Sequence, residues 1–283
     1  MTSVLVIARL TVREAARRKL VAVFLLLTVG MVSLSGWGFY RLSHSQRLLT
    51  SGETQIAVPQ ASILFMFMFS FVVALSASAI AAPAVSSEVE SGVLQTVVTR
   101  PIRRGEVFIG KWLGLAVLVA GYSIGVAILQ MAVVDWVSGF LPPNAAAVAV
   151  YLFAEGLVIL TMILGISTRL STLATGVLGV ALFGSAWLAG VVGALGASFK
   201  IPALRTVGDV ARLLLPTDGL WHGAIYYLEP SSFVSQRLSE EAGAGGNPFF
   251  ATSPPSWAYL TFAAVWLFAV LVAGIVSFEH REL

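Results

Sequence analysis

Long apolar runs separated by polar segments dominate the chain. A helix that crosses a bilayer needs about 20 predominantly apolar residues. Six runs reach that length, and the fourth is interrupted only by Glu155. The expected membrane-spanning helices cover residues 20–39, 60–84, 112–136, 145–168, 172–197 and 256–277. The pattern predicts an all-α polytopic membrane protein, with residues 1–283 forming one transmembrane domain.

Composition agrees with this prediction and narrows the possible functions. The 283 residues are 58% apolar and 11% charged, whereas soluble domains carry roughly 25% charged residues. The mean hydropathy is +0.90. The chain has no Cys, and its three His are scattered, so neither disulfides nor a metal site is expected. The net charge of +3 is not concentrated in a basic domain, so we expect no nucleic-acid binding.

Residues 1–19 are expected to form an amphipathic helix at the membrane surface. Arg9, Arg13 and Arg17 recur every four residues on one face, and small or apolar side chains occupy the other. A cleaved secretory signal is the alternative, because residues 33–35 resemble a small-x-small cleavage site. The long polar lead-in and the five further spans favour an uncleaved anchor.

The distribution of Lys and Arg predicts the orientation in the membrane. With the N-terminus inside, the cytoplasmic segments carry eleven basic residues and the short external segments carry two. Positive charge accumulates on the cytoplasmic side of membrane proteins. We therefore expect both termini, and the polar segment 86–111, to be cytoplasmic in the cell membrane.

Segment 86–111 is the most informative polar stretch. Ser86 or Ser87 can cap a short helix whose first turn holds Glu88 and Glu90, and apolar residues, Leu94 among them, follow at helical spacing. Pro101 would end that helix. A cationic cluster then precedes the next span; its members are Arg100, Arg103, Arg104 and Lys111. The cluster suits anionic headgroups or an acidic partner surface, although it could serve only to fix topology.

The stretch from Glu88 to Gly114 resembles the first cytoplasmic loop of type-2 ABC transporter (ABC-2) permeases. The likeness is closest to the permease group of the multi-copper-enzyme maturation transporter. An acidic start, a Gly, an amphipathic segment, Arg-Pro-x-x-Arg and a Gly-Lys pair carry the resemblance, which departs from the family at Val93, where Thr is common. A looser likeness in helix order covers the whole chain.

The resemblance implies that the segment is a coupling helix that docks into a separate ATPase subunit. It also implies two ATPase copies carrying ATP and magnesium, a second permease copy or close paralogue, and export as the direction of transport. The implied ATPase-coupling residues are Glu88, Glu90, Leu94, Arg100, Pro101, Arg103 and Arg104. Glu88 and Glu90 could instead act only as charges at a helix start.

Residues 105–111 match the beginning of a phosphate-binding loop, but their context excludes that function. Trp112 stands where Ser or Thr must reach magnesium, and Gly105 follows no strand. No arrangement typical of a hydrolase is visible either. We therefore expect no enzyme activity and no cofactor in this chain, so that ATP energy would come from another subunit.

Residues 198–256 are expected to form an external loop. Apolar residues at helical spacing predict a short helix over 203–215, with Arg205, Asp209 and Arg212 on its polar face, and an aromatic-rich helix over 218–228. The resemblance implies that these two helices re-enter the outer leaflet. Residues 231–256 are expected to form a flexible flap.

Two further patterns concern the interior of the bundle. Gly110 with Gly114, and Gly121 with Gly125, are spaced four residues apart, which permits close contacts within the chain or with a second copy. Glu155 lies within a span, where an ionised carboxylate costs roughly 3 kcal/mol. It should face the interior, either as a pathway residue or as a neutral group hydrogen-bonded to a neighbouring helix.

The sequence leaves two other function classes open besides an ATP-driven permease. One is an ATP-independent channel or secondary carrier, although no internal repeat supports it. The other is a membrane scaffold or sensor that moves no solute. The apolar, aromatic spans do not identify a substrate.

Overall fold

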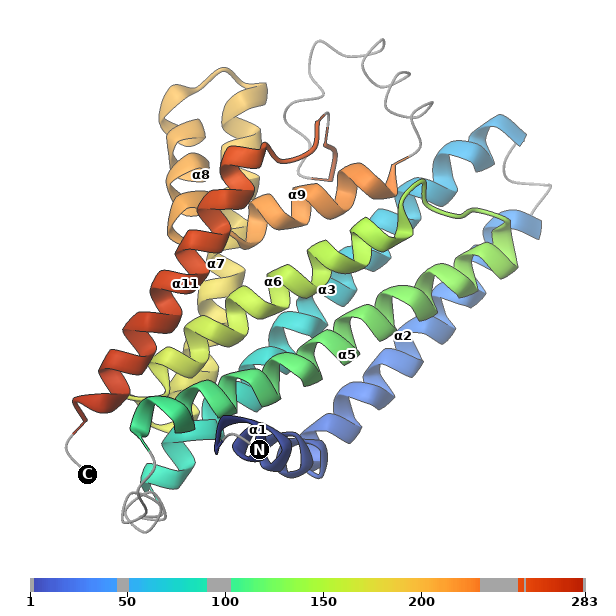
Figure 1. The fold of residues 1–283 in the computed structure, drawn as a ribbon. Coiled ribbons are helices and arrows are strands. Elements are labelled where there is room, and N and C mark those ends of the chain that lie inside the picture. Colours follow the sequence, from blue (N-terminus) through green and yellow to red (C-terminus); the bar gives the residue numbers. More distant parts are fainter. Residues whose placement is uncertain (1–2, 45–50, 91–102, 230–248, 252, 282–283) are drawn as a thin grey trace.

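The computed structural model describes residues 3–44, 51–90, 103–229, 249–251 and 253–281, and all regular structure in these ranges is α-helical. Figure 1 shows the helices in chain order. Their bounds are α1 Ser3–Ala16, α2 Lys19–His44, α3 Ser51–Glu90, α5 Arg104–Ser138, α6 Ala145–Ile166, α7 Thr172–Ser198, α8 Pro202–Leu214, α9 Thr217–Leu228 and α11 Trp257–Glu279.

Six of these helices, α2, α3, α5, α6, α7 and α11, are long and apolar enough to cross a membrane. Each of them overlaps one of the six predicted spans, and α3 and α5 extend well beyond theirs. Helix α3 has 40 residues and α5 has 35; at 1.5 Å per residue, α3 is about 60 Å long. Both helices therefore exceed the roughly 30 Å of a hydrocarbon core.

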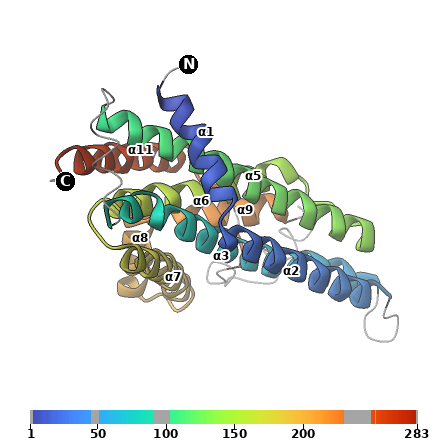
Figure 2. The same cartoon turned by 90° about the horizontal axis from the view of Figure 1, so that it is seen from below.

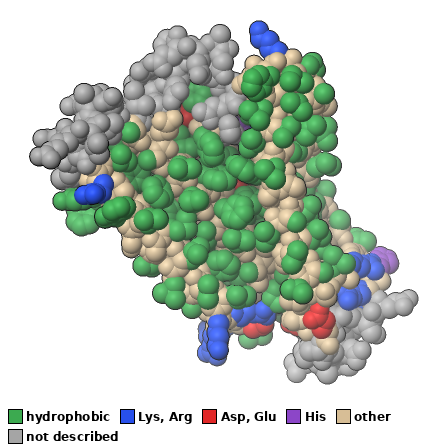
Figure 3. Space-filling view, turned by 180° about the vertical axis from the view of Figure 1, so that it is seen from behind, with side chains coloured by type: hydrophobic (Ala, Val, Ile, Leu, Met, Phe, Trp, Pro, Cys, Tyr) green, Lys and Arg blue, Asp and Glu red, His purple; other side chains and the backbone are tan. Residues whose placement is uncertain are grey.

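The outer surface of the bundle exposes many large apolar side chains, which lipid or another membrane helix would have to cover. Leu26 on α2, Leu173 on α7 and Phe268 on α11 are 72%, 80% and 65% exposed. Figure 3 shows hydrophobic side chains across the middle of one face, with several Lys and Arg side chains at the lower end. Figure 1 shows both termini at that end. The chain is thus a multi-span membrane protein.

Helix α6 forms the centre of the core. Leu152, Ile159, Leu160 and Ile163 on this helix are fully buried. Helices α3, α5, α7, α9 and α11 all pack against α6. Most of α6 from Leu152 to Leu164 is buried or half-buried, which agrees with its almost continuously apolar sequence.

Helix α1 lies across the first half of α5 (Figure 2). A Cβ atom on Gly114 would stand 2.6 Å from the carbonyl oxygen of Ala8, so only Gly permits this approach. The close contact predicted at Gly110 and Gly114 is confirmed as one within the chain. Added Cβ atoms on Gly121 and Gly125 would meet nothing within 4 Å among the described residues.

The predicted helix start at Ser86 or Ser87 is wrong. Helix α3 continues through both residues to Glu90. The Ser86 hydroxyl donates to the Ala82 carbonyl at 2.6 Å, and the Ser87 hydroxyl donates to the Pro83 carbonyl. Serine can satisfy its hydroxyl inside a helix in this way as well as at a cap, so its presence did not mark a boundary.

Two short helices follow α7, close to their predicted positions. Helix α8 folds back along α7, where a Cβ on Gly193 would stand 2.7 Å from the Gly208 Cα. Helix α9 packs against α6, and its Trp221 and Ile225 are 3% and 1% exposed. Trp221, one of the aromatic residues of this helix, therefore belongs to the core.

Candidate functional site

The end of α3 is tied to α5 by an ion pair whose ammonium group is buried and whose carboxylate is partly exposed. The Lys111 ammonium lies 2.5 Å from Glu88 Oε2 and donates to the Ala84 carbonyl at 2.5 Å. Lys111 is 6% exposed. It therefore does not belong to an exposed cationic cluster, and Glu88 has a structural partner within its own chain.

Glu90 ties the same end of α3 to α7. Glu90 Oε1 accepts a hydrogen bond from the Thr172 backbone N–H at 2.9 Å, and Oε2 accepts one from the Thr172 hydroxyl at 3.3 Å. The Ser171 side chain at the N-cap makes no capping bond. Because a carboxylate is favourable at a helix N-terminus, Glu90 takes over the capping of α7.

The first turn of α5 is tied to the end of α11. Arg104 donates to the Arg281 carbonyl at 2.8 Å and to the Glu279 carbonyl at 3.3 Å. Arg169 donates to the Ser277 hydroxyl at 2.9 Å, and Arg281 donates to the Thr168 carbonyl. These guanidinium groups donate hydrogen bonds to backbone carbonyls at the ends of α6 and α11, where the helix dipole is negative.

Of the remaining predicted coupling residues, the structure describes only Arg103. Arg103 is the exposed residue before α5, and its side chain makes no capping bond. Leu94, Arg100 and Pro101 lie outside the described residues. The structure thus brings Glu88, Glu90, Arg103 and Arg104 to one end of the bundle, at the two sides of segment 91–102.

Glu155 lies deep in the bundle, as predicted. It is 2% exposed, and the Ser70 hydroxyl on α3 lies 2.8 Å from each carboxyl oxygen. A cavity of about 10 Å³, the size of one water molecule, borders Glu155, Ser70 and Asp218. The hydrogen bond to Ser70 agrees with the hypothesis that Glu155 is a group hydrogen-bonded to a neighbouring helix. Across the small cavity, the carboxyl group also has Asp218 on α9 as a polar neighbour.

A second polar cluster was missed at the sequence level. Arg212 Nε donates to Asp218 Oδ2 at 2.6 Å, and His222 Nδ1 lies 2.8 Å from the Asp218 carbonyl oxygen. Asp218 is 6% exposed, and a Cβ on Gly190 would collide with its carboxylate. The sequence did contain a signal for this cluster. Arg212 lies on the predicted polar face of its helix, and the acidic residue Asp218 follows shortly after Pro216.

The described residues offer no cluster of three or more His, Asp or Glu that could hold a metal ion. The contacts described above join helix ends to one another through charged side chains. Such an arrangement can transmit movement between helices and can hold helix termini in a fixed relation.

Comparison with known proteins identifies the family. The model of the ABC-2 family transporter protein matches residues 5–283, nearly the whole chain. No curated protein matches the sequence. ABC-2 permeases are membrane subunits without catalytic activity of their own and act with ABC ATPase subunits. With six candidate spans and this match over nearly its full length, the chain belongs to the ABC-2 family of transporter proteins.

Proposed function

We propose that the chain is one half of an ATP-driven exporter. Two copies, or one copy and a close paralogue, would form a twelve-helix pathway and would bind two ATPase subunits that carry ATP and magnesium. Membership of the ABC-2 family and the six apolar helices support this assembly. The excess of Lys and Arg in segments 1–19 and 86–111 supports cytoplasmic termini in the cell membrane.

Segment 86–111 is the proposed coupling element, and the contacts at its two sides carry this proposal. Glu88 pairs with Lys111 on α5, Glu90 caps α7 and Arg104 holds the end of α11. A force applied to this segment would therefore act on four helices at once. Closure of the ATPase dimer would supply that force and switch the pathway from inward to outward access.

The contacts divide the predicted coupling residues into two groups. Glu88, Glu90 and Arg104 bind other parts of this chain, so their proposed role is to transmit movement. Exposed Arg103 is proposed to contact the ATPase directly, together with Leu94, Arg100 and Pro101. Kinship with the multi-copper-enzyme maturation group rests on the motif from Glu88 to Gly114 and stays a prediction.

The test uses the ATPase that co-purifies with the tagged wild-type chain from native membranes. Arg103→Ala should reduce the amount of ATPase recovered, because an exposed contact is lost. Arg104→Ala should leave recovery unchanged and lower the ATP hydrolysis that the permease stimulates. Arg9→Ala is the matched control, since Arg9 is exposed on α1 outside the segment.

Normal recovery and normal stimulated hydrolysis in both variants would refute the coupling role. Transport by the isolated chain in vesicles with only an ion gradient would instead indicate a channel or secondary carrier. Partner binding without movement of any solute would indicate a scaffold or sensor.

A further inference from the structure

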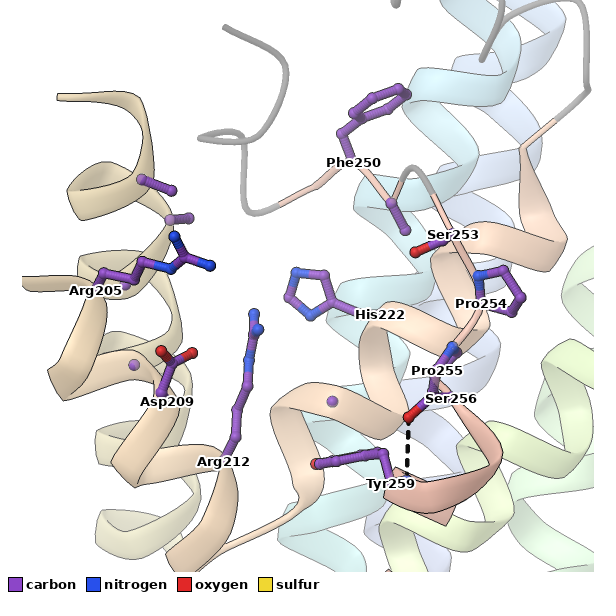
Figure 4. Close-up of a pocket in the computed structure, with 16 residues that line it drawn as sticks. Arg205, Asp209, Arg212, His222, Phe250, Ser253, Pro254, Pro255, Ser256 and Tyr259 are labelled. Atoms are coloured by element: carbon purple, nitrogen blue, oxygen red, sulfur yellow. Dashed lines mark hydrogen bonds between the residues drawn. The ribbon is translucent and has the colours of Figure 1, made fainter. Parts of the chain in front are cut away.

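A cavity of about 550 Å³ lies between the α7–α8 hairpin, α9 and the start of α11 (Figure 4). Its volume is within the range of small-molecule pockets, about 300–1,000 Å³. Figure 1 places these helices at the end of the bundle opposite to both termini. This outer cavity is therefore separate from the coupling segment.

Two arginines and a histidine converge on the outer cavity. Arg205 and Arg212 are two turns apart on one face of α8, and His222 lies on α9. In Figure 4 these three side chains extend into the space between the two helices. The two arginines thus approach the cavity from α8, and the histidine approaches it from α9.

The ion pair with Asp218 fixes one of these guanidinium groups. Arg212 uses Nε for Asp218, whose side chain is 4% exposed behind it. Within the described ranges, the other two guanidinium nitrogens of Arg212 have no hydrogen-bond acceptor, and the Arg205 guanidinium has none either. Both side chains therefore present donors to the cavity.

His222 contributes a further polar atom. Its Nδ1 lies 2.8 Å from the backbone carbonyl of Asp218, so Nδ1 carries the proton and donates it to that oxygen. Nε2 is left on the side of the ring that faces the cavity (Figure 4). Asp218 thus positions both Arg212 and His222.

The charged groups at the cavity wall leave room only for an anion of low charge. Arg205 and Arg212 are balanced by Asp209 and by Asp218, which is paired with Arg212, so the wall would hold an anion through unused guanidinium donors rather than through an excess of positive charge. Each guanidinium can offer forked donors to the cavity from the same face of α8, a pattern that binds the oxygens of a phosphate group. Phe250 and Pro254 in the lining provide apolar surface for the rest of a ligand.

We propose that the outer cavity binds the phosphate group of an amphiphile or a soluble phosphate ester, with Arg205 and Arg212 as the binding donors. The proposal does not depend on ATPase coupling, because binding can be measured on the permease alone. It assigns a ligand class to α8 and α9 that the proposed exporter role does not specify.

Binding can be tested by calorimetric titration of the purified full chain in detergent. One arm uses dihexanoyl phosphatidylglycerol, and the other uses glycerol 3-phosphate. Arg205→Ala removes one set of charged hydrogen bonds and should weaken binding roughly 10-fold or more. Arg212→Lys keeps a cation beside Asp218, removes the fork and should also weaken binding. The control is Lys200→Gln, which removes an exposed positive charge close to α8 and outside the cavity lining.

The two arms separate the sources of the phosphate. Binding of the lipid probe alone would identify a lipid headgroup, and equal binding of both probes would identify the phosphate ester itself. The proposal is overturned if neither probe binds, or if Arg205→Ala and Lys200→Gln both bind as tightly as the wild type.

Discussion

The Glu88–Lys111 pair makes an asymmetric prediction about stability. Lys111 has 7% of its side chain exposed and Glu88 has 26%. Glu88→Gln would leave a nearly buried ammonium without a negative charge to balance it, whereas Lys111→Met would leave a carboxylate that water can partly reach. We therefore expect Glu88→Gln to destabilise the chain more than Lys111→Met does.

The expected magnitudes follow from the loss of charged hydrogen bonds. Such bonds contribute about 1.5–3 kcal/mol each, and breaking a fully buried pair costs about 3–5 kcal/mol. Because Glu88 is a quarter exposed, we expect about 2 kcal/mol for Lys111→Met and about 3 kcal/mol for Glu88→Gln. The double variant should cost about 1–2 kcal/mol less than the sum of the single variants, as groups in contact do.

The assay is reversible unfolding in mixed micelles, followed by the fluorescence of the chain's seven Trp. The four members of the cycle are compared under identical conditions. If the effects of the two substitutions add, the residues do not interact. A larger cost for Lys111→Met than for Glu88→Gln would refute the argument from burial.

Three further predictions concern other contacts. Gly114→Val should lower the free energy of unfolding by about 1–3 kcal/mol, because its side chain would strike Ala8, whereas Gly121→Val, in open space, should be neutral in the same unfolding assay. Arg104→Ala should speed hydrogen exchange at the end of α11; unchanged exchange would show that the carbonyl contacts contribute nothing. Glu155→Gln keeps the partner Ser70, so assembly should be normal and ATP hydrolysis by the reconstituted complex should change; normal hydrolysis would leave Glu155 with a packing role alone.

The membrane-spanning helices could be predicted because lipid imposes a simple requirement. Every backbone group in the hydrocarbon region must be paired within the chain, so length and apolar character suffice to identify a helix. The end of α3 could not be predicted in this way. Ser86 can cap a helix or bond to its own helix, and only the surrounding packing decides between these options.

The polar contacts of the candidate site were also hidden from the sequence. Glu90 was recognised as a charge suited to a helix N-terminus, and that physical preference is confirmed. The helix is α7, however, which begins 82 residues later. The pairing of Arg212 with Asp218 depends on the turn at Pro216, which lets the two short helices fold toward each other. Residue type indicated what each charge needs, and the tertiary fold decided which group meets that need.

Asp218 lies between the outer cavity and the small cavity at Glu155. It pairs with Arg212, which lines the outer cavity, and it also borders the small cavity at Glu155. A ligand that drew Arg212 away would leave a buried carboxylate near a second carboxyl group, which is costly in a low-dielectric interior. Protonation of one carboxyl group, or a shift of α9 relative to α6, the helix that carries Glu155 and packs against α9, would relieve that cost. Ligand binding at the outer cavity and the environment of Glu155 are therefore expected to depend on each other.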